Sequence, residues 1–76
     1  MAELLAYLAR ELVDEPDAVR VETEERDDAL LLTLHVAPGD VGKVIGRQGR
    51  IARALRTVVR AGGPSAGRRL QLEIVG

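Results

Sequence analysis

The sequence contains no cysteine, tryptophan or phenylalanine, and Tyr7 is its only aromatic residue. Without cysteine, disulfides and thiolate metal sites are excluded. One aromatic ring cannot form the series of stacking platforms on which many single-strand-binding proteins hold successive bases. No segment approaches the roughly 18 consecutive apolar residues of a membrane span, and the N-terminus is acidic, unlike an export signal. We therefore expect a cytoplasmic protein.

Groups suited to catalysis or metal binding are also scarce. His35 is the only histidine, and no cysteine or second histidine accompanies it as a metal ligand. Thr57 and Ser65 lack the neighbouring base that activates a hydroxyl nucleophile. The glycines have neither the P-loop spacing nor the dinucleotide-binding spacing. These absences predict no enzyme, no cofactor and no metal site, with His35 as a solvated strand residue.

The 76 residues predict one domain, spanning 1–76, which would bury about 60% of its unfolded surface. The net charge is only −1, but the two halves differ strongly. Residues 1–40 hold eleven acidic and three basic side chains, whereas residues 41–76 hold eight basic and one acidic. Such asymmetry indicates a polyanion partner on one face, although mutual attraction of the two halves explains it equally well.

Hydrophobic periodicity predicts three helices and three strands. Their order is helix 2–14, strand 19–24, strand 29–36, short helix 40–45, helix 48–61 and strand 70–75. Asp40 is the expected N-cap of the short helix, 26–28 a hairpin turn and 62–67 a loop. Because two helices connect the second and third strands, these strands should run parallel, while the first two form an antiparallel hairpin.

The predicted fold is therefore α+β, in the order α-β-β-α-α-β, with a three-stranded mixed sheet covered on one face by three helices. The leucine-rich strand 29–36 should lie at its centre. The other face should be exposed and polar, with Arg20, Glu22, Glu24, Thr33, His35, Gln71 and Glu73 on it.

The most informative segment is the glycine-rich turn from Gly46 to Gly49 and the helix after it. Two glycines separated only by Arg47 and Gln48 leave a bare backbone whose N–H groups can approach a phosphate. The positive end of the following helix dipole points at the same place. This arrangement predicts a phosphate-binding turn.

The helix after the turn is amphipathic. Ile51, Ala54, Leu55, Val58 and Val59 should face the core, with Arg50, Arg53, Arg56 and Arg60 opposite. A charged helix face is usually just solvated. Beside the glycine turn, however, Arg47 and Arg50 are expected to touch nucleic acid. For Arg56 and Arg60, contact and simple solvation are equally compatible with the sequence.

The segment Val44-Ile45-Gly46-Arg47-Gln48-Gly49 matches the V-I-G-x-x-G core of KH domains, and the element order resembles their type II arrangement. In that family an isoleucine usually follows three residues after the second glycine, where this chain has Ala52, with Ile51 one residue earlier. Segments 14–19, 35–38 and 53–59 are similar to the small stand-alone bacterial KH-domain RNA-binding proteins, the KhpA family. The resemblance covers essentially the whole chain.

The resemblance implies a groove for about four nucleotides of single-stranded RNA, with the GxxG turn and its helices as one wall and a strand edge as the other. Gly46 and Gly49 would admit phosphates. Arg47 and Gln48 would supply side-chain contacts, Lys43, Arg50 and Arg53 nearby charge, and Val44 and Ile45 an apolar floor for bases.

The resemblance also implies an RNA chaperone that acts in cell-length control and peptidoglycan homeostasis. It would be a homodimer or would pair with KhpB, a larger KH protein. The alternative is an interaction or dimerisation module in which RNA binding is secondary. In that case the GxxG region and the helix 48–61 form a protein interface, with Ala52, Ala54 and Val59 allowing close helix approach.

Overall fold

The computed structural model describes residues 2–26, 29–62 and 69–76 of the chain. Most of the predicted hairpin turn and of the predicted loop 62–67 lies outside these ranges. The elements are α1 (Ala2–Leu12), η1 (Pro16–Ala18), β1 (Arg20–Arg26), β2 (Ala29–His35), η2 (Pro38–Asp40), α2 (Val41–Ile45), η3 (Arg47–Gly49), α3 (Arg50–Gly62) and β3 (Arg69–Val75).

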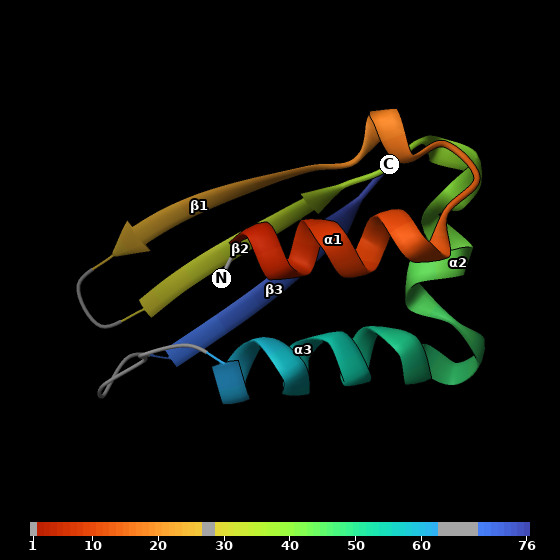
Figure 1. The fold of residues 1–76 in the computed structure, drawn as a ribbon. Helices are drawn as coiled ribbons and strands as arrows, with labels where there is room; N and C mark the ends of the chain where they lie inside the picture. The colour runs from red at the N-terminus through yellow and green to blue at the C-terminus, as the bar shows by residue number, and fades with distance from the viewer. Residues whose placement is uncertain (1, 27–28, 63–68) are drawn as a thin grey trace.

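The sheet has the predicted topology (Figure 1). Its strand order is β1-β2-β3, with β2 in the centre. β1 pairs antiparallel with β2, and β2 pairs parallel with β3. Leu32 lies opposite Thr23 on one side and Leu72 on the other. The parallel pair is possible because α2 and α3 return the chain to the end of the sheet where β2 begins, and β3 starts from there.

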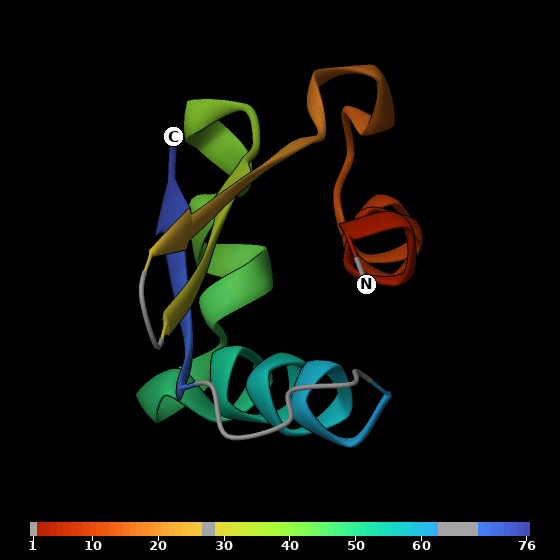
Figure 2. The same cartoon turned by 90° about the vertical axis from the view of Figure 1, so that its left-hand side faces the viewer.

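The helices lie on one side of the sheet (Figure 2). Between these two layers is a core whose fully buried large side chains are Leu5, Leu32, Leu34, Val44 and Val59. Burial of each such side chain contributes about 1.5–3 kcal/mol. The α+β class, the mixed sheet and the helical layer are therefore confirmed. Val59, proposed above as a contact for a partner helix, instead belongs to the core.

The other sheet face carries the predicted polar side chains, but His35 is not simply solvated. Its imidazole Nε2 lies against the carboxylate of Glu22 on the neighbouring strand, and 27% of its side chain is exposed. Arg20 reaches the same carboxylate at 3.6 Å. Arg20, on the same strand, therefore offsets part of the acidic charge of β1.

The described helices are short. The longest, α3, has 13 residues and carries arginine along its length, and among the described residues no helix could cross a membrane. α1 ends at Leu12, before the predicted end at residue 14, and the strands differ from their predicted bounds by one or two residues. Differences of this size are common at element ends.

Candidate nucleic-acid interface

The GxxG turn is built by an abrupt change in backbone direction between α2 and α3. α2 ends where the N–H of Gly46 donates to the carbonyl of Gly42 at 2.9 Å. Gly46 then takes φ 76° and ψ 173°, a conformation open essentially to glycine alone. The N–H of Gly49 donates to the carbonyl of Gly46 at 3.2 Å, which closes the tight turn η3. α3 starts at once, at Arg50.

The two glycines are needed for different reasons. A Cβ on Gly46 would lie 2.7 Å from Cγ1 of Ile51, so the first glycine is also fixed by packing. Gly49 has φ 73°, but a Cβ there would meet nothing within 4 Å. The space over Gly49 is therefore open on the surface, as close approach of a phosphate requires. Ile51 takes up the contact with Gly46, although the family pattern has isoleucine one position later.

The conformation of Gln48 corrects the predicted start of the helix 48–61. It has φ 57° and ψ 24°, the left-handed conformation, and the helix therefore begins two residues later than predicted. That conformation costs a residue with a Cβ about 1–2 kcal/mol. Arg53, from the first turn of α3, donates from Nη2 to the carbonyl oxygen of Gln48 at 2.9 Å.

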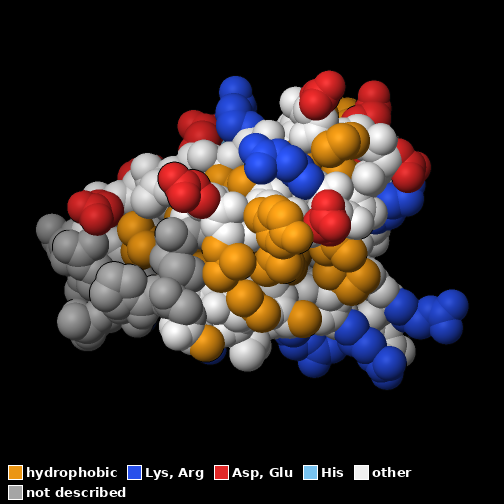
Figure 3. Space-filling view, in the orientation of Figure 1, with side chains coloured by type: hydrophobic (Ala, Val, Ile, Leu, Met, Phe, Trp, Pro, Cys, Tyr) orange, Lys and Arg blue, Asp and Glu red, His pale blue; other side chains and the backbone are white. Residues whose placement is uncertain are grey.

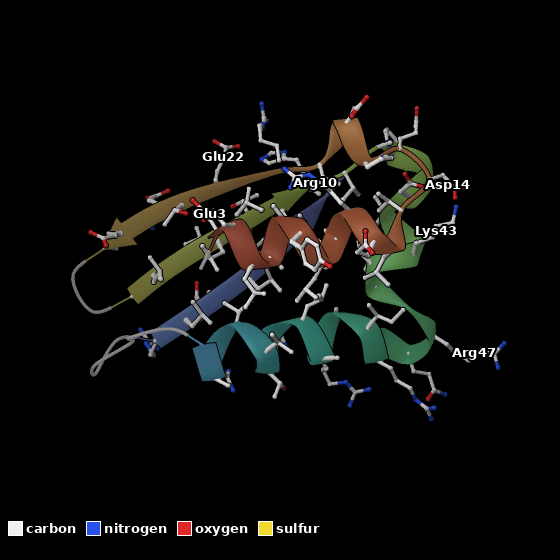
Figure 4. The ribbon with its side chains drawn as sticks, viewed as in Figure 1. Glu3, Arg10, Asp14, Glu22, Lys43 and Arg47 are labelled. Carbon is white, nitrogen blue, oxygen red and sulfur yellow. The ribbon has the colours of Figure 1, made fainter. Side chains whose placement is uncertain are left out.

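The turn leaves backbone donors for an anion. Arg47 and Gln48 are the first two residues of the turn, so their N–H groups have no acceptor within it. They lie at the N-terminal end of α3, where the helix dipole is positive. Both side chains are exposed, and that of Arg47 projects outward from the corner of the molecule (Figure 4). Together these groups form an anion-binding corner.

The two apolar residues before the turn have different positions. Val44 is fully buried in the core, so its side chain cannot touch a base, and the expectation that it forms part of an apolar floor is wrong. Ile45 is 36% exposed and stays available. Its place at the end of α2 puts it directly beside Gly46.

Lys43, in α2, forms ion pairs with acidic residues on the side of the turn that faces the C-terminal end of α1. Its ammonium contacts the carboxylate of Asp14 and lies 3.4 Å from Oδ1 of Asp40 (Figure 4). The bond to Asp14 raises the pKa of Lys43 against the opposing effect of desolvation, with Asp40 adding to the rise. Its charge is therefore locally compensated, which weakens the expectation that it serves a bound polyanion.

The sequence predicts Asp40 as the N-cap of α2, but in the structure its side chain does not cap that helix. Its side chain makes no cap bond to α2, is almost fully buried and accepts the N–H of Glu15 at 3.1 Å from Oδ2. Burial acts to raise the pKa of Asp40, but backbone donors at Glu15 and Asp14 and the ammonium of Lys43 together lower it. The carboxylate thus ties the segment after α1 to the base of the turn.

The arginines of the turn and of α3 differ from Lys43 in their partners. In residues 2–26, 29–62 and 69–76, no ion pair involves Arg47, Arg50, Arg56 or Arg60, whereas Lys43 pairs with acidic residues of the other half. This distribution favours an external polyanion over mutual attraction of the halves. No cluster of three or more potential metal ligands occurs in the same ranges.

A second surface feature, which periodicity did not reveal, lies between α1 and α3. We call it the α1–α3 groove. Its volume is about 390 Å³, and it is lined by Leu8, Glu11, Leu12, Arg50, Ile51, Ala54, Leu55 and Val58. Ala54 and Val58, predicted to face the core, are exposed here, Val58 by 41%. Figure 3 shows apolar side chains gathered on this face, and Tyr7 of α1 is 58% exposed.

The structure thus brings the predicted site residues into four places. Gly46, Arg47, Gln48, Gly49 and Arg53 meet at the turn, with Ile45 beside it. Lys43 faces the acidic exit of α1, and Arg50 stands at the end of the α1–α3 groove. Val44 is in the core.

Comparison with known proteins agrees with this geometry. Residues 2–74 match the family model described as KhpA/KhpB, KH domain. The chain is 47% identical to RNA-binding protein KhpA of Clostridium acetobutylicum over 75 residues, which cover 99% of this chain and all of that protein. It is 51% identical to RNA-binding protein KhpA of Treponema pallidum over 73 residues, 96% of this chain and 91% of that one. The protein of that name from Bacillus subtilis is 45% identical, covering 97% and 91%.

Proposed function

This chain belongs to the KhpA/KhpB family of KH domains, and we propose that it binds single-stranded RNA through the turn Gly46–Gly49. Residues 1–76 would act as a single type II KH domain. The relatives named above are RNA-binding proteins and not enzymes, in keeping with the lack of a catalytic constellation in the sequence. We propose a non-catalytic RNA chaperone of the cytoplasm, with the family's roles in cell shape and peptidoglycan homeostasis.

The anion-binding corner supports this proposal most directly. The bare backbone at Gly49 lets a phosphate reach the N–H groups of Arg47 and Gln48, and the Arg47 side chain is free to meet it. Backbone donors recognise phosphate and not the base. In this proposal the protein therefore holds about four nucleotides with little sequence preference.

We propose that the bases lie next to this corner. β3 forms one edge of the sheet, and in this proposal its outer side would be the second wall of the groove, opposite α2 and α3. Ile45 supplies an exposed apolar side chain at the base of the turn. In the absence of aromatic platforms, such aliphatic contact gives weak binding in which the phosphate term dominates.

Single-stranded RNA should bind more tightly than duplex RNA, and binding should weaken with salt. If two or three phosphates are contacted, the logarithm of the affinity should fall with the logarithm of salt concentration with a slope of about −2. Fluorescence anisotropy with a labelled mixed-sequence strand, free and annealed to its complement, measures both effects. Equal affinity for the duplex would contradict the narrow groove, and the absence of any binding would contradict the proposed function.

The α1–α3 groove favours a second function, self-association. A lone groove for four nucleotides binds weakly, whereas two grooves in one assembly raise the effective concentration of the second contact. The exposed apolar side chains of Leu4, Tyr7, Leu12 and Val58 are the residues available for burial against a partner. A second copy of this chain is the simplest partner, and a KhpB-like protein is the alternative.

Glutamate at position 58 should weaken this association strongly. The Val58→Glu variant would bury an unpaired carboxylate against apolar side chains, and we expect at least a tenfold weaker dimer. Light scattering with size exclusion at several concentrations measures the mass. Thr57→Glu, one residue along the same helix and also exposed, is the matched control and should behave as wild type. A wild-type protein that stays monomeric would refute the dimer.

A further inference from the structure

The contact between Arg53 and the GxxG turn sets it apart from the other arginines of α3. Its Nη2 donates to the carbonyl oxygen of Gln48 at 2.9 Å. The side chain is exposed, so burial does not force it against the turn. In the described part of the chain, Arg50, Arg56 and Arg60 make no such contact. The exposed guanidinium of Arg53 therefore forms a hydrogen bond with the protein's own backbone.

The bond completes the restraint of a single peptide group. The peptide between Gln48 and Gly49 has its N–H on the carbonyl of Gly46 at 3.2 Å and its carbonyl on Arg53 at 2.9 Å. Both polar ends of this peptide are therefore held. The two N–H groups that precede it, those of Arg47 and Gln48, are the ones left for an anion.

The turn needs this restraint because little else fixes it. Gly46 and Gly49 have the largest backbone freedom of any residue type, and Gln48 sits in a conformation that side chains rarely adopt. Rotation of the Gln48 carbonyl away from Arg53 would put a negative dipole near the anion-binding corner. A donor on that carbonyl fixes the conformation before the ligand arrives, which lowers the ordering cost of binding.

We infer that Arg53 is a positioning residue: its guanidinium holds the Gln48–Gly49 peptide so that the turn is ready for a phosphate, and it is not itself a phosphate contact. This inference rests on the proposed RNA binding for its functional consequence. Its structural part concerns the free protein alone. Arg53 then acts through Gln48, whereas Arg47 acts directly on the ligand.

Salt dependence separates the two roles. For single strands, each phosphate contact adds about 0.7 to the slope of log affinity against log salt. In Arg53→Met we expect about tenfold weaker RNA binding, of the order of one hydrogen bond to a charged group, with the wild-type slope retained. Arg60→Met removes the same charge two turns along α3, away from the turn, and should leave affinity within about twofold.

Backbone order in the free protein tests the positioning itself. ¹⁵N relaxation should give Gln48 and Gly49 order parameters near 0.85 in wild type and in Arg60→Met, falling below about 0.6 in Arg53→Met. A slope smaller by about 0.7 in Arg53→Met, or unchanged order at Gln48, would overturn the inference. Because relaxation is measured without RNA, it decides the role of Arg53 even if wild-type protein binds no RNA, the result that would instead defeat the proposed function.

Discussion

Replacing Arg47 and Gln48 together by aspartate is expected to abolish RNA binding and to leave the fold intact. The change puts two carboxylates beside the backbone N–H groups that the turn leaves for an anion, and removes the cation that projects from it. At about 4 Å and the dielectric of water, each unit of charge is worth about 1 kcal/mol. Three units are lost in all, so affinity should fall by more than about 100-fold.

The fold should tolerate this change for local reasons. Both side chains are exposed, and neither is part of the core. Aspartate is among the residues most often found in the left-handed conformation that position 48 requires. We therefore expect the circular dichroism spectrum and the melting temperature to stay close to those of the wild type.

Anisotropy titration of single-stranded RNA, alongside thermal melting, measures both parts of this expectation. Arg10→Asp, a charge reversal on α1, is the control and should keep binding within about threefold. A folded double variant that still binds as wild type would show that the turn is not the site. Should the double variant unfold, Arg47→Asp alone keeps position 48 unchanged and is expected to lose at least tenfold.

The periodic parts of the chain could be predicted because their causes are local. Alternation in β1, β2 and β3 follows from a strand with one face on the core, and the leucines of β2 correctly predicted the central strand. The parallel pairing of β2 and β3 follows from the two helices between them. Gly46 could be predicted as a helix end because only glycine suits its backbone angles.

The remaining features depend on contacts between distant residues. Asp40 looked like a helix cap by local spacing, but its carboxylate accepts from Glu15, 25 residues earlier. Lys43 looked like free charge beside the turn, yet it meets Asp14 across 29 residues. A rule based on neighbouring residues cannot detect such pairs.

Two further predictions for α3 were wrong, for different reasons. Ala54 and Val58 lie on the apolar side of α3, but α1 covers only part of that side and leaves the α1–α3 groove. The sequence predicts a helix from Gln48, but Gln48 adopts left-handed angles with its carbonyl held by Arg53, so α3 begins two residues later.

Alanine at position 46 is expected to have the largest effect on stability of any single change in the turn. The backbone angles of Gly46 lie in a region that costs a residue with a Cβ of the order of 1–3 kcal/mol. The new methyl group would also meet Ile51 at 2.7 Å, and Ile51 packs against the core, so it has little room to yield. We expect Gly46→Ala to lower the free energy of unfolding by about 3 kcal/mol.

For a domain of this size, such a loss lowers the melting temperature by about 15 °C, which calorimetry or thermal circular dichroism would detect. Two other glycines of the segment separate the two causes. Gly49→Ala shares the positive φ but has open space, so it should cost only about 1 kcal/mol. Gly42→Ala lies inside α2 with nothing near its Cβ, and should stabilise by about 0.5–1 kcal/mol. If Gly46→Ala melted like Gly49→Ala, contact with Ile51 would not be what requires glycine at position 46, and backbone conformation alone would account for both.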